Sequence, residues 1–356
     1  MFSDSKIAMI ILAAGLSKRM SVFKPLLPTG DLPAVVRCVR AAETAGVRDI
    51  IVVTGHKRDE LESVLLKMAP HARTVFNSRF SDGMFSSVRA GVSALTDDTD
   101  GFFILPSDCC AVTGDMLAML IWHFEKAGGL AVTRPKFNGQ RGHPPLIPAV
   151  YIAPLLSYNG DNGLKGFLSP LPTLEIEMEN NAVLLDMDTP SDYAALLDHM
   201  GLPGYPSPAL CKDTLARHGA SEDIIRHGEQ VASIALELSR GLDGLNLDLL
   251  ESACLLHDIK RAEPNHAHAG MVLLLKEGYP KTALLIGGHM DLPDMPGQII
   301  SELELLYLAD KLCRRDKYVP LEETALELEA KYSSDAEALA SAKRRIDHAL
   351  IIRNRL

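Results

Sequence analysis

The sequence predicts two domains in succession, an α/β domain with a mostly parallel sheet and then an all-α bundle. Through residues 1–200, short β-branched runs alternate with helical stretches, which is the pattern of repeated βαβ units. Residues 201–208 are rich in Gly and Pro and are expected to form a linker. Residues 209–356 then keep helical periodicity with almost no strand pattern. The first domain is therefore expected to be Rossmann-like and the second to be helical.

Each element is predicted from its apolar period and from the residues that flank it. In the first domain, runs rich in Ile, Val and Phe predict strands at 7–14, 49–55, 73–77, 101–108 and 129–135. Amphipathic stretches between these strands predict helices at 34–46, 59–69, 86–96 and 114–128. A further strand is expected to end at Asp188, just before a helix start. In the second domain, helices are expected at 221–241, 247–262, 267–279, 280–290 and 300–315.

Composition limits the classes of partner. The 356 residues are 47% hydrophobic and 23% charged, with a formal charge of -10 and no block of Lys or Arg, so nucleic acid is a poor partner. The N-terminus lacks a signal-peptide pattern and no apolar run reaches membrane-spanning length, so no membrane partner is expected. The six cysteines form no C-x-x-C pair. We expect a cytoplasmic protein with reduced thiols, of an oligomeric state that the sequence does not indicate.

The stretch after the first strand combines small residues with cations. Ala13, Ala14 and Gly15 let the backbone approach a phosphate, and Arg19 and Lys24 supply positive charge. Ligands bind at the carboxyl ends of strands in an open parallel sheet, and this loop lies there. The alternative interpretation is an ordinary Gly turn followed by a solvated, cationic helix start.

Two acids are expected at the same edge of the sheet. Asp108 ends the strand at 101–108, and Asp188 is expected to end another strand. Carboxylates there can hold Mg²⁺, which bridges phosphate oxygens. Asp188 alone is better explained as a helix cap, but two acids beside a cationic Gly loop are not explained by capping. The sequence therefore predicts a Mg²⁺-dependent site for a nucleoside triphosphate.

Five motifs occur in order over the first 200 residues: LAAGLSKRM followed by Lys24, NSRFSDGMFSSVRAG, GQRGHPPLI, GDNGLKGFL and DMDTPSDY. This set resembles the MobA-like nucleotidyltransferases, which link CTP or GTP to molybdopterin. LAAG, SSVRAG and RGHP together look most like the molybdenum cofactor cytidylyltransferase subgroup, so CTP is favoured. Ser21 stands where the family usually has Gly, and PSDCC stands where it has Gly-Asp-x-Pro.

The resemblance implies a role for each motif. The loop at 13–15, Arg19 and Lys24 would hold the triphosphate, and Asp108 and Asp188 would hold Mg²⁺. Arg19, Lys24 and Asp108 would be the catalytic residues. The base would be met by Asn77, Gly83, Ser86 and Ser87, and the acceptor side by Arg141 and His143. A terminal phosphate of the acceptor would attack the α-phosphorus and expel pyrophosphate, which requires positioning and charge neutralisation.

Histidines and aspartates recur across the second half. His257 and Asp258 are adjacent in LLHDIKR, which is expected to lie inside an apolar helix, and two buried polar neighbours need a shared partner such as a metal ion. Imidazole and carboxylate together suit Fe, Mn or a similar divalent metal better than Ca²⁺. Each histidine alone would be explained as a surface or satisfied core residue. The further candidates are His227, His266, His268, His289 and Asp310.

The order H…HD…D, met by His227, His257, Asp258 and Asp310, resembles the HD-domain metal-dependent phosphohydrolases. The contexts NHAHAG, IGGHMD and LYLADKL look like the diiron HD subgroup that hydrolyses dinucleoside polyphosphates. That resemblance implies a second metal held by His266 and His289, with His268 a close rival of His266. Arg261 stands where the pattern often has Lys.

Together the two halves predict a bifunctional enzyme. The first half would transfer a nucleotide from an NTP to a phosphorylated acceptor such as molybdopterin. The second half would hydrolyse a nucleotide or a phosphoester. The alternative is a nucleotidyltransferase for a sugar- or polyol-phosphate whose HD half is a non-catalytic nucleotide sensor. The sequence leaves both open.

Overall fold

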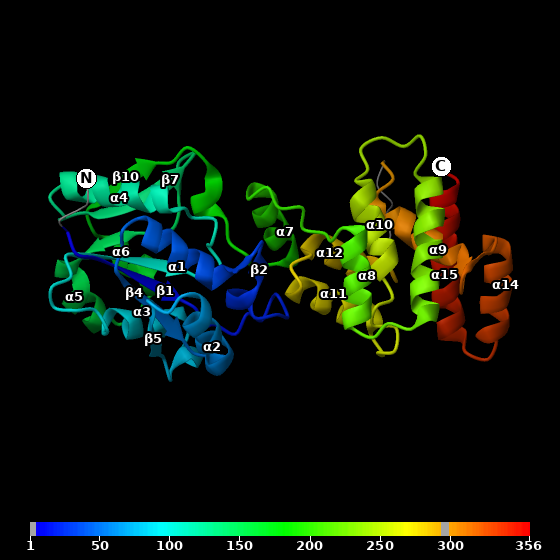
Figure 1. The fold of residues 1–356 in the computed structure, drawn as a ribbon, viewed down its shortest axis with the longest axis horizontal. Coiled ribbons are helices and arrows are strands. Elements are labelled where there is room, and N and C mark those ends of the chain that lie inside the picture. Colours follow the sequence, from blue (N-terminus) through cyan, green and yellow to red (C-terminus); the bar gives the residue numbers. More distant parts are fainter. Residues whose placement is uncertain (1–4, 293–298) are drawn as a thin grey trace. The chain divides into compact units, whose positions relative to one another are not determined.

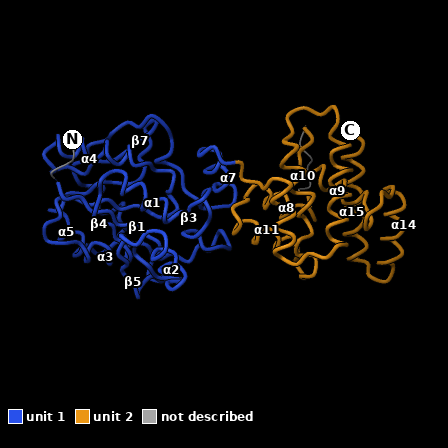
Figure 2. Tube along the Cα trace, viewed as in Figure 1, with its two compact units in different colours: residues 1–202 blue, residues 203–356 orange. Residues whose placement is uncertain are grey.

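The computed structural model describes residues 5–292 and 299–356. The chain divides into two compact units, residues 1–202 and 203–356 (Figure 2). The division falls after helix α7 (Pro190–His199) has ended and before helix α8 (Pro208–Arg217) begins. Within the described ranges, no helix is both long enough and apolar enough to cross a membrane.

Unit 1 is built on one sheet, with the strand order β10-β7-β9-β6-β1-β4-β5 and β8 paired to β7. Strand β1 (Ile7–Leu12) is parallel to both of its neighbours, β4 (Asp49–Thr54) and β6 (Gly101–Pro106). Strand β9 runs antiparallel to β6 and β7, so the sheet is mixed but mostly parallel, which confirms the predicted fold class. The remaining strands of this sheet are β5 (Arg73–Phe76), β7 (Val132–Phe137), β8 (Gln140–Arg141), β9 (Leu146–Pro148) and β10 (Thr173–Glu177). A separate two-stranded sheet pairs β2 (Pro28–Thr29) with β3 (Leu32–Pro33).

Helices cover both faces of this sheet, so all six side chains of β1 are buried (Figure 1). Helix α1 (Ala34–Thr44) packs against α4 (Gly114–Lys126), whereas α3 (Met84–Val92) packs against α5 (Ile152–Ser157) and α6 (Gly163–Leu168). Helix α2 (Arg58–Met68) lies against β4. The contact of α3 with β1 is close, because a Cβ on Gly91 would meet Ile10 Cγ2 at 2.4 Å.

The prediction of a strand that ends at Asp188 is wrong. After β10 the chain makes a 3₁₀ turn at Asn181–Leu184 and then runs without regular structure to Asp188. Helix α7 begins behind a capping box, in which the side chains of Thr189 and Asp192 each bond the other residue's backbone amide. Asp188 therefore lies on a loop, and its place is set by its contacts rather than by strand geometry.

Unit 2 is helical, as predicted, apart from a short hairpin of β11 (Cys313–Arg314) and β12 (Lys317–Tyr318). Helix α9 packs against α10 and α13, α11 packs against α12, and α15 packs against α13 and α14 (Figure 1). The bounds are α9 (Glu222–Leu238), α10 (Leu247–Leu256), α11 (His266–Lys276), α12 (Pro280–Gly288), α13 (Glu302–Lys311), α14 (Leu321–Lys331) and α15 (Ala336–Arg353).

The pair His257 and Asp258 was expected inside a helix, and this expectation is wrong. Helix α10 ends at Leu256, His257 is its C-terminal cap, and Asp258 lies in the turn that follows. Both side chains are nonetheless buried, at 0% and 3% exposed. The apolar period of LLHDI reflects burial of the turn rather than continuation of the helix.

Candidate active sites

The loop after β1 starts at the carboxyl edge of the sheet. The Ala13 amide donates to the Val53 carbonyl at 3.0 Å, and the Ala14 carbonyl accepts from the His56 amide at 3.1 Å. These bonds tie the start of the loop to β4, so the Ala13 amide is engaged within the protein. A Cβ built on Gly15 meets no protein atom within 4 Å. The space beside Gly15 is therefore open, as a close approach by a ligand requires.

A tight turn carries the chain from this loop to the cations. Ser17 has a φ of 52°, its carbonyl accepts from the Met20 amide, and its hydroxyl accepts from the Lys24 amide at 3.1 Å. Ser21 has a φ of 57°, in the left-handed region that favours glycine. Met20 is buried and anchors the turn. The family's usual Gly at position 21 thus matches a conformation that this chain adopts with Ser.

Four of the predicted residues meet in one cluster at this edge. Lys24 Nζ lies 2.8 Å from Asp108 Oδ2 and 2.7 Å from Asp188 Oδ1. Arg19 lies 2.8 Å from the other oxygen of Asp188, Oδ2. Burial alone would lower the pKa of Lys24, but the charges of Asp108 and Asp188 raise it above its ordinary value. Burial likewise opposes ionisation of Asp188, yet Lys24 and Arg19 lower its pKa.

A third carboxylate belongs to this cluster and was not predicted. Burial, followed by the charges of Asp188 and Asp108, raises the pKa of Asp186. The D-x-D spacing in DMDTPSDY was the available signal, since residues two apart on an extended segment point the same way. The cluster therefore contains three carboxylates, one ammonium group and one guanidinium group.

The residues that were expected to contact the base form hydrogen bonds with one another and with their own loop. The buried Asn77 donates from Nδ2 to Ser86 Oγ at 2.8 Å and to Ser87 Oγ at 3.0 Å. Its Oδ1 accepts from the Arg79 amide at 3.0 Å. Gly83, with a φ of 101°, forms the N-cap of α3. The structure brings these four residues together, and their contact with a base remains a prediction.

The residues expected on the acceptor side differ in exposure. Arg141 is half exposed and pairs with Glu175 at 2.6 Å. His143 is mostly buried, its amide donates to the Val183 carbonyl at 2.8 Å, and its Nδ1 has no hydrogen-bond partner within the described part of the chain. Burial and then the charge of Arg134 lower the pKa of His143, which keeps its imidazole neutral. The charge of Asp108 acts in the opposite direction and partly offsets this lowering of the pKa.

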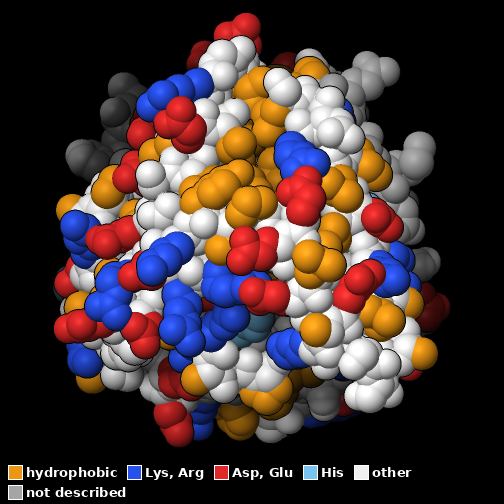
Figure 3. Space-filling model, turned by 90° about the vertical axis from the view of Figure 1, so that its right-hand side faces the viewer, with side chains coloured by type: hydrophobic (Ala, Val, Ile, Leu, Met, Phe, Trp, Pro, Cys, Tyr) orange, Lys and Arg blue, Asp and Glu red, His pale blue; other side chains and the backbone are white. Residues whose placement is uncertain are grey.

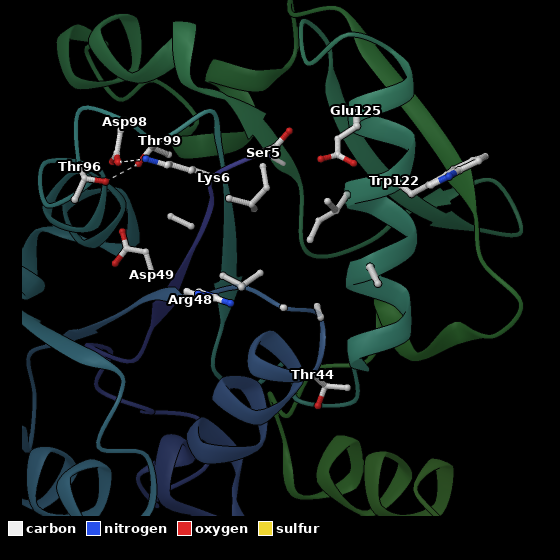
Figure 4. Close-up of a pocket in the computed structure, with 17 residues that line it drawn as sticks. Ser5, Lys6, Thr44, Arg48, Asp49, Thr96, Asp98, Thr99, Trp122 and Glu125 are labelled. Atoms are coloured by element: carbon white, nitrogen blue, oxygen red, sulfur yellow. Dashed lines mark hydrogen bonds and ion pairs between the residues drawn. The ribbon is translucent and has the colours of Figure 1, made fainter. Parts of the chain in front are cut away.

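A cavity of about 820 Å³ lies at the opposite edge of the sheet, where β1 and β4 begin (Figure 4). Its lining includes Lys6, which pairs with Asp98 at 2.5 Å, and Asp49. Trp122 and Glu125 of α4 form another wall. None of the residues predicted to bind the nucleotide lines this cavity, so it is separate from the carboxylate cluster.

In unit 2, six side chains form two groups of three potential metal ligands. His227, His257 and Asp310 form one group, and Asp258, His266 and His289 form the other, each with its ligand atoms within 4.8 Å of one another. His257 Nε2 lies 3.5 Å from both Asp258 Oδ2 and Asp310 Oδ1. The two groups therefore adjoin, and the side chains come from α9, α10, α11, α12 and α13 or the turns that end them.

Three of these imidazoles are oriented by backbone carbonyls. The Nδ1 atoms of His227, His257 and His289 lie 2.7, 2.8 and 2.6 Å from the carbonyls of Arg315, Cys254 and Ile286. An Nδ1–H that donates to a carbonyl leaves the Nε2 lone pair as the acceptor. Metal-ligating histidines are held in this way in known metal sites. The backbone thus aims three Nε2 atoms at the space that the carboxylates share.

Several atoms that face this space lack a hydrogen-bond partner. His257 Nε2, Asp258 Oδ1 and His266 Nε2 are buried without one in the described chain. An unpaired buried polar atom is costly, so a group of them indicates a ligand that satisfies them together. Burial, and then the neighbouring His257, lower the pKa of His289 to about 4, so it stays neutral. Burial opposes protonation of His227, yet a hydrogen bond to Asp310 raises its pKa to about 10, so an ion that binds Nε2 would have to displace a proton from it.

Of the two rival histidines, the structure brings His266 to the site. His266 Nε2 lies 3.4 Å from Asp258 Oδ1. His268 is exposed on α11 and belongs to neither group of ligands. Helix α11 packs against α12, and the ring of His266 lies 5.4 Å from that of His289, the C-cap of α12.

Cations border the two carboxylates. Lys311 Nζ lies 2.7 Å from Asp310 Oδ2, and Arg261 pairs with Asp258 Oδ2. A pocket of about 320 Å³, lined in part by Lys311, Arg314 and Arg345, adjoins Asp310. On the face that it views, Figure 3 shows Lys and Arg side chains around a recessed histidine. This arrangement suits an anionic substrate.

Comparisons with known proteins find a match in each of the two units. A family model described as the MobA-like NTP transferase domain matches residues 9–176, and one described as the HD domain matches residues 224–315. The molybdenum cofactor cytidylyltransferase of Escherichia coli (strain K12) is 29% identical over 189 residues, covering 53% of this chain and 94% of that protein. The bifunctional protein GlmU of Clavibacter sepedonicus is 35% identical over 103 residues, 28% of this chain but only 21% of that protein.

Among solved structures, a nucleotidyl transferase from Methanothermobacter thermautotroptrophicus has a TM-score of 0.47 at 25% identity, covering 55% of this chain and 97% of that one. The two family models match different parts of the chain, one in each compact unit. The chain therefore joins a MobA-like nucleotidyltransferase domain to an HD hydrolase domain.

Proposed function

We propose that this chain is a bifunctional enzyme. Its first unit transfers a nucleotide from an NTP, with CTP favoured, to a phosphorylated acceptor such as molybdopterin. Its second unit hydrolyses a nucleotide or phosphoester with a pair of divalent transition metals. The observation that carries the proposal is that each unit gathers its charged residues at one point, cations and carboxylates in unit 1, and two adjoining ligand groups in unit 2.

In unit 1, the open space at Gly15 would admit the phosphates, and Arg19 and Lys24 would neutralise their charge. Asp108 and Asp188 offer the carboxylate oxygens that Mg²⁺ prefers, and Asp186 adds a third nearby carboxylate. When bound, Mg²⁺ would supply charge neutralisation at the phosphates. The side chains would hold the acceptor phosphate in line with the α-phosphorus, and pyrophosphate would leave.

The choice of CTP and of molybdopterin rests on the E. coli relative. The match covers 94% of that protein but 53% of this chain. The test is pyrophosphate release by the full chain, measured for CTP, GTP, ATP and UTP against molybdopterin and a panel of sugar- and polyol-phosphates. We expect the fastest release with CTP and molybdopterin. Faster release with a sugar- or polyol-phosphate would identify that compound class, and not molybdopterin, as the acceptor. Faster release with GTP would identify GTP, and not CTP, as the nucleotide substrate.

In unit 2, His227, His257 and Asp310 would hold one ion, and Asp258, His266 and His289 the other. The donor set of four imidazoles and two carboxylates fits Fe, Mn or a similar ion. When bound, such ions would lower the pKa of water and neutralise charge on a phosphate. The cations Lys311 and Arg261 would add attraction for an anionic substrate.

The alternative for unit 2 is a nucleotide sensor that binds without turnover. Phosphate release from mono- and dinucleoside polyphosphates, measured with the metal-loaded chain, separates the two. We expect release that stops when the metal is removed by chelation and resumes when Mn²⁺ or Fe²⁺ is restored. Nucleotide binding in calorimetry without any release of phosphate, in metal-loaded protein, would support the sensor.

A further inference from the structure

One lysine stands between the two carboxylates that we assign to Mg²⁺. Lys24 Nζ contacts Asp108 Oδ2 at 2.8 Å and Asp188 Oδ1 at 2.7 Å. Arg19 contacts Asp188 Oδ2, so both oxygens of Asp188 already face a cation. Among the described residues, Arg19 forms its ion pair with Asp188 and not with Asp108, whereas Lys24 bridges the two acids. Lys24 is thus the cation of the cluster that contacts both acids.

A divalent ion at this position competes with that ammonium. Mg²⁺ binds oxygen at about 2.0–2.1 Å and tolerates little deviation from octahedral geometry. An ion that used both Asp108 and Asp188 would draw on the oxygens that Lys24 now contacts, and the two cations would repel each other at close range. Metal binding to both acids therefore requires the Lys24 side chain to move away.

The side chain of Lys24 is able to move while its backbone stays in place. The Lys24 amide is held by Ser17 Oγ at 3.1 Å, which fixes the start of the side chain. An ammonium on a flexible four-carbon stem is a mobile point charge. The side chain is only 11% exposed, so it needs another anion in exchange for the two carboxylates. The triphosphate that would enter beside Gly15 supplies such an anion.

We infer that Lys24 keeps the metal position closed until a nucleoside triphosphate draws its ammonium away, so that metal and nucleotide bind with positive coupling. Lys24 acts here as a positioning residue. The inference rests on the proposed Mg²⁺ site at Asp108 and Asp188. Linkage requires the same factor in both directions, so the metal should tighten nucleotide binding as much as the nucleotide tightens metal binding.

The experiment measures Mn²⁺ binding, by calorimetry and by electron paramagnetic resonance, with and without a non-hydrolysable CTP analogue. It uses the full chain with His257→Ala and Asp258→Ala, so that Mn²⁺ reports on unit 1. In this background we expect the analogue to tighten Mn²⁺ binding by about 5- to 150-fold, the usual range of such couplings. Lys24→Met should tighten Mn²⁺ binding in the absence of nucleotide and lower the coupling, leaving only the part that comes from direct attraction between the metal and the phosphates.

Arg19→Met is the matched control, because it also removes a cation from Asp188 but does not release Asp108. It should leave most of the coupling in place. Lys24→Arg, which retains the charge, should keep Mn²⁺ binding weak without nucleotide. Equal Mn²⁺ affinity in Lys24→Met and the parent, with coupling intact, would overturn the inference. If Asp108→Asn leaves Mn²⁺ binding unchanged, the proposed metal site itself fails, which is a distinct outcome.

Discussion

The two candidate sites differ in what faces their carboxylates. In unit 1, Lys24 contacts both Asp108 and Asp188, and Arg19 contacts Asp188. Arg19 lies in the turn that follows β1, and Lys24 begins the 3₁₀ helix Lys24–Leu26. In unit 2, three imidazoles held by backbone carbonyls point toward Asp258 and Asp310, and buried nitrogen and oxygen atoms there have no hydrogen-bond partner in the described chain.

This difference predicts two kinds of metal affinity. A site whose ligands are fixed by the backbone loses little freedom on binding, so unit 2 should hold metal tightly by itself. In unit 2, Lys311 and Arg261 also pair with carboxylates, but only at the Oδ2 atoms of Asp310 and Asp258, whose Oδ1 atoms face imidazoles. In unit 1, both oxygens of Asp188 and one oxygen of Asp108 face cations, so unit 1 should hold metal well only together with its nucleotide. The following changes test the contrast, in order of decreasing expected effect.

The largest effect is expected for His257→Ala combined with Asp258→Ala. This change removes one ligand from each group. Loss of an outer-shell partner alone costs about 10–100-fold in metal affinity, and loss of two ligands should cost more, so the purified chain should contain almost no transition metal. Elemental analysis of protein prepared without chelators measures this.

His266→Ala and His268→Ala form a matched pair for the same measurement. The first removes an imidazole that faces Asp258, and the second removes an exposed one from the same helix. Only His266→Ala should lower the metal content. Metal loss in His268→Ala instead, or wild-type protein without metal, would contradict the assigned ligand groups.

The second effect is the loss of nucleotidyl transfer in Asp108→Asn. A neutral amide binds Mg²⁺ poorly and no longer balances Lys24, so we expect kcat for pyrophosphate release to fall by about 10²–10³-fold. Asp98→Asn is the control, because it makes the same change at an exposed ion pair with Lys6. Unchanged turnover in Asp108→Asn, with the fold intact by circular dichroism, would rule out this metal ligand.

Most helices and strands could be predicted from the sequence because the patterns that indicate them are local. The strands at the centre of the sheet and the helices of unit 2 follow from apolar period and capping residues, and they place Asp108 at the sheet edge. The end of α10 at Leu256 and the loop before Asp188 were not predictable, since they depend on packing that the period does not encode. The bridge made by Lys24 spans 84 residues to Asp108 and 164 to Asp188, which no local pattern reveals.

A smaller effect is expected for Gly15→Ala. A Cβ there meets no protein atom within 4 Å, so the melting temperature should not change. The methyl group would instead enter the space assigned to the triphosphate, and loss of one charge-assisted hydrogen bond would weaken CTP binding by about 1.5–3 kcal/mol. Calorimetric titration with a non-hydrolysable analogue measures this.

Gly91→Ala provides the opposite pattern. Its Cβ would meet Ile10 Cγ2 at 2.4 Å and Val53 Cγ2 at 3.0 Å, so overpacking should lower the free energy of unfolding by about 1–3 kcal/mol. Nucleotide affinity measured well below the melting temperature should be retained. A loss of stability in Gly15→Ala that matches that of Gly91→Ala would show that the first glycine serves packing rather than ligand approach.

The smallest effect is expected from separating the units. A chain cut after Leu202 leaves α7 complete on one piece and keeps Ser207, which caps α8 by accepting from the Leu210 amide, on the other. Each piece has the length of an ordinary domain and its own buried core. We expect two folded pieces, the first with unchanged nucleotidyl transfer and the second with unchanged metal content. Circular dichroism, pyrophosphate release and elemental analysis measure these. A folded but inactive first piece that recovers when the second is added would show that the HD unit acts on the transferase, and the sensor would then become the better account of unit 2.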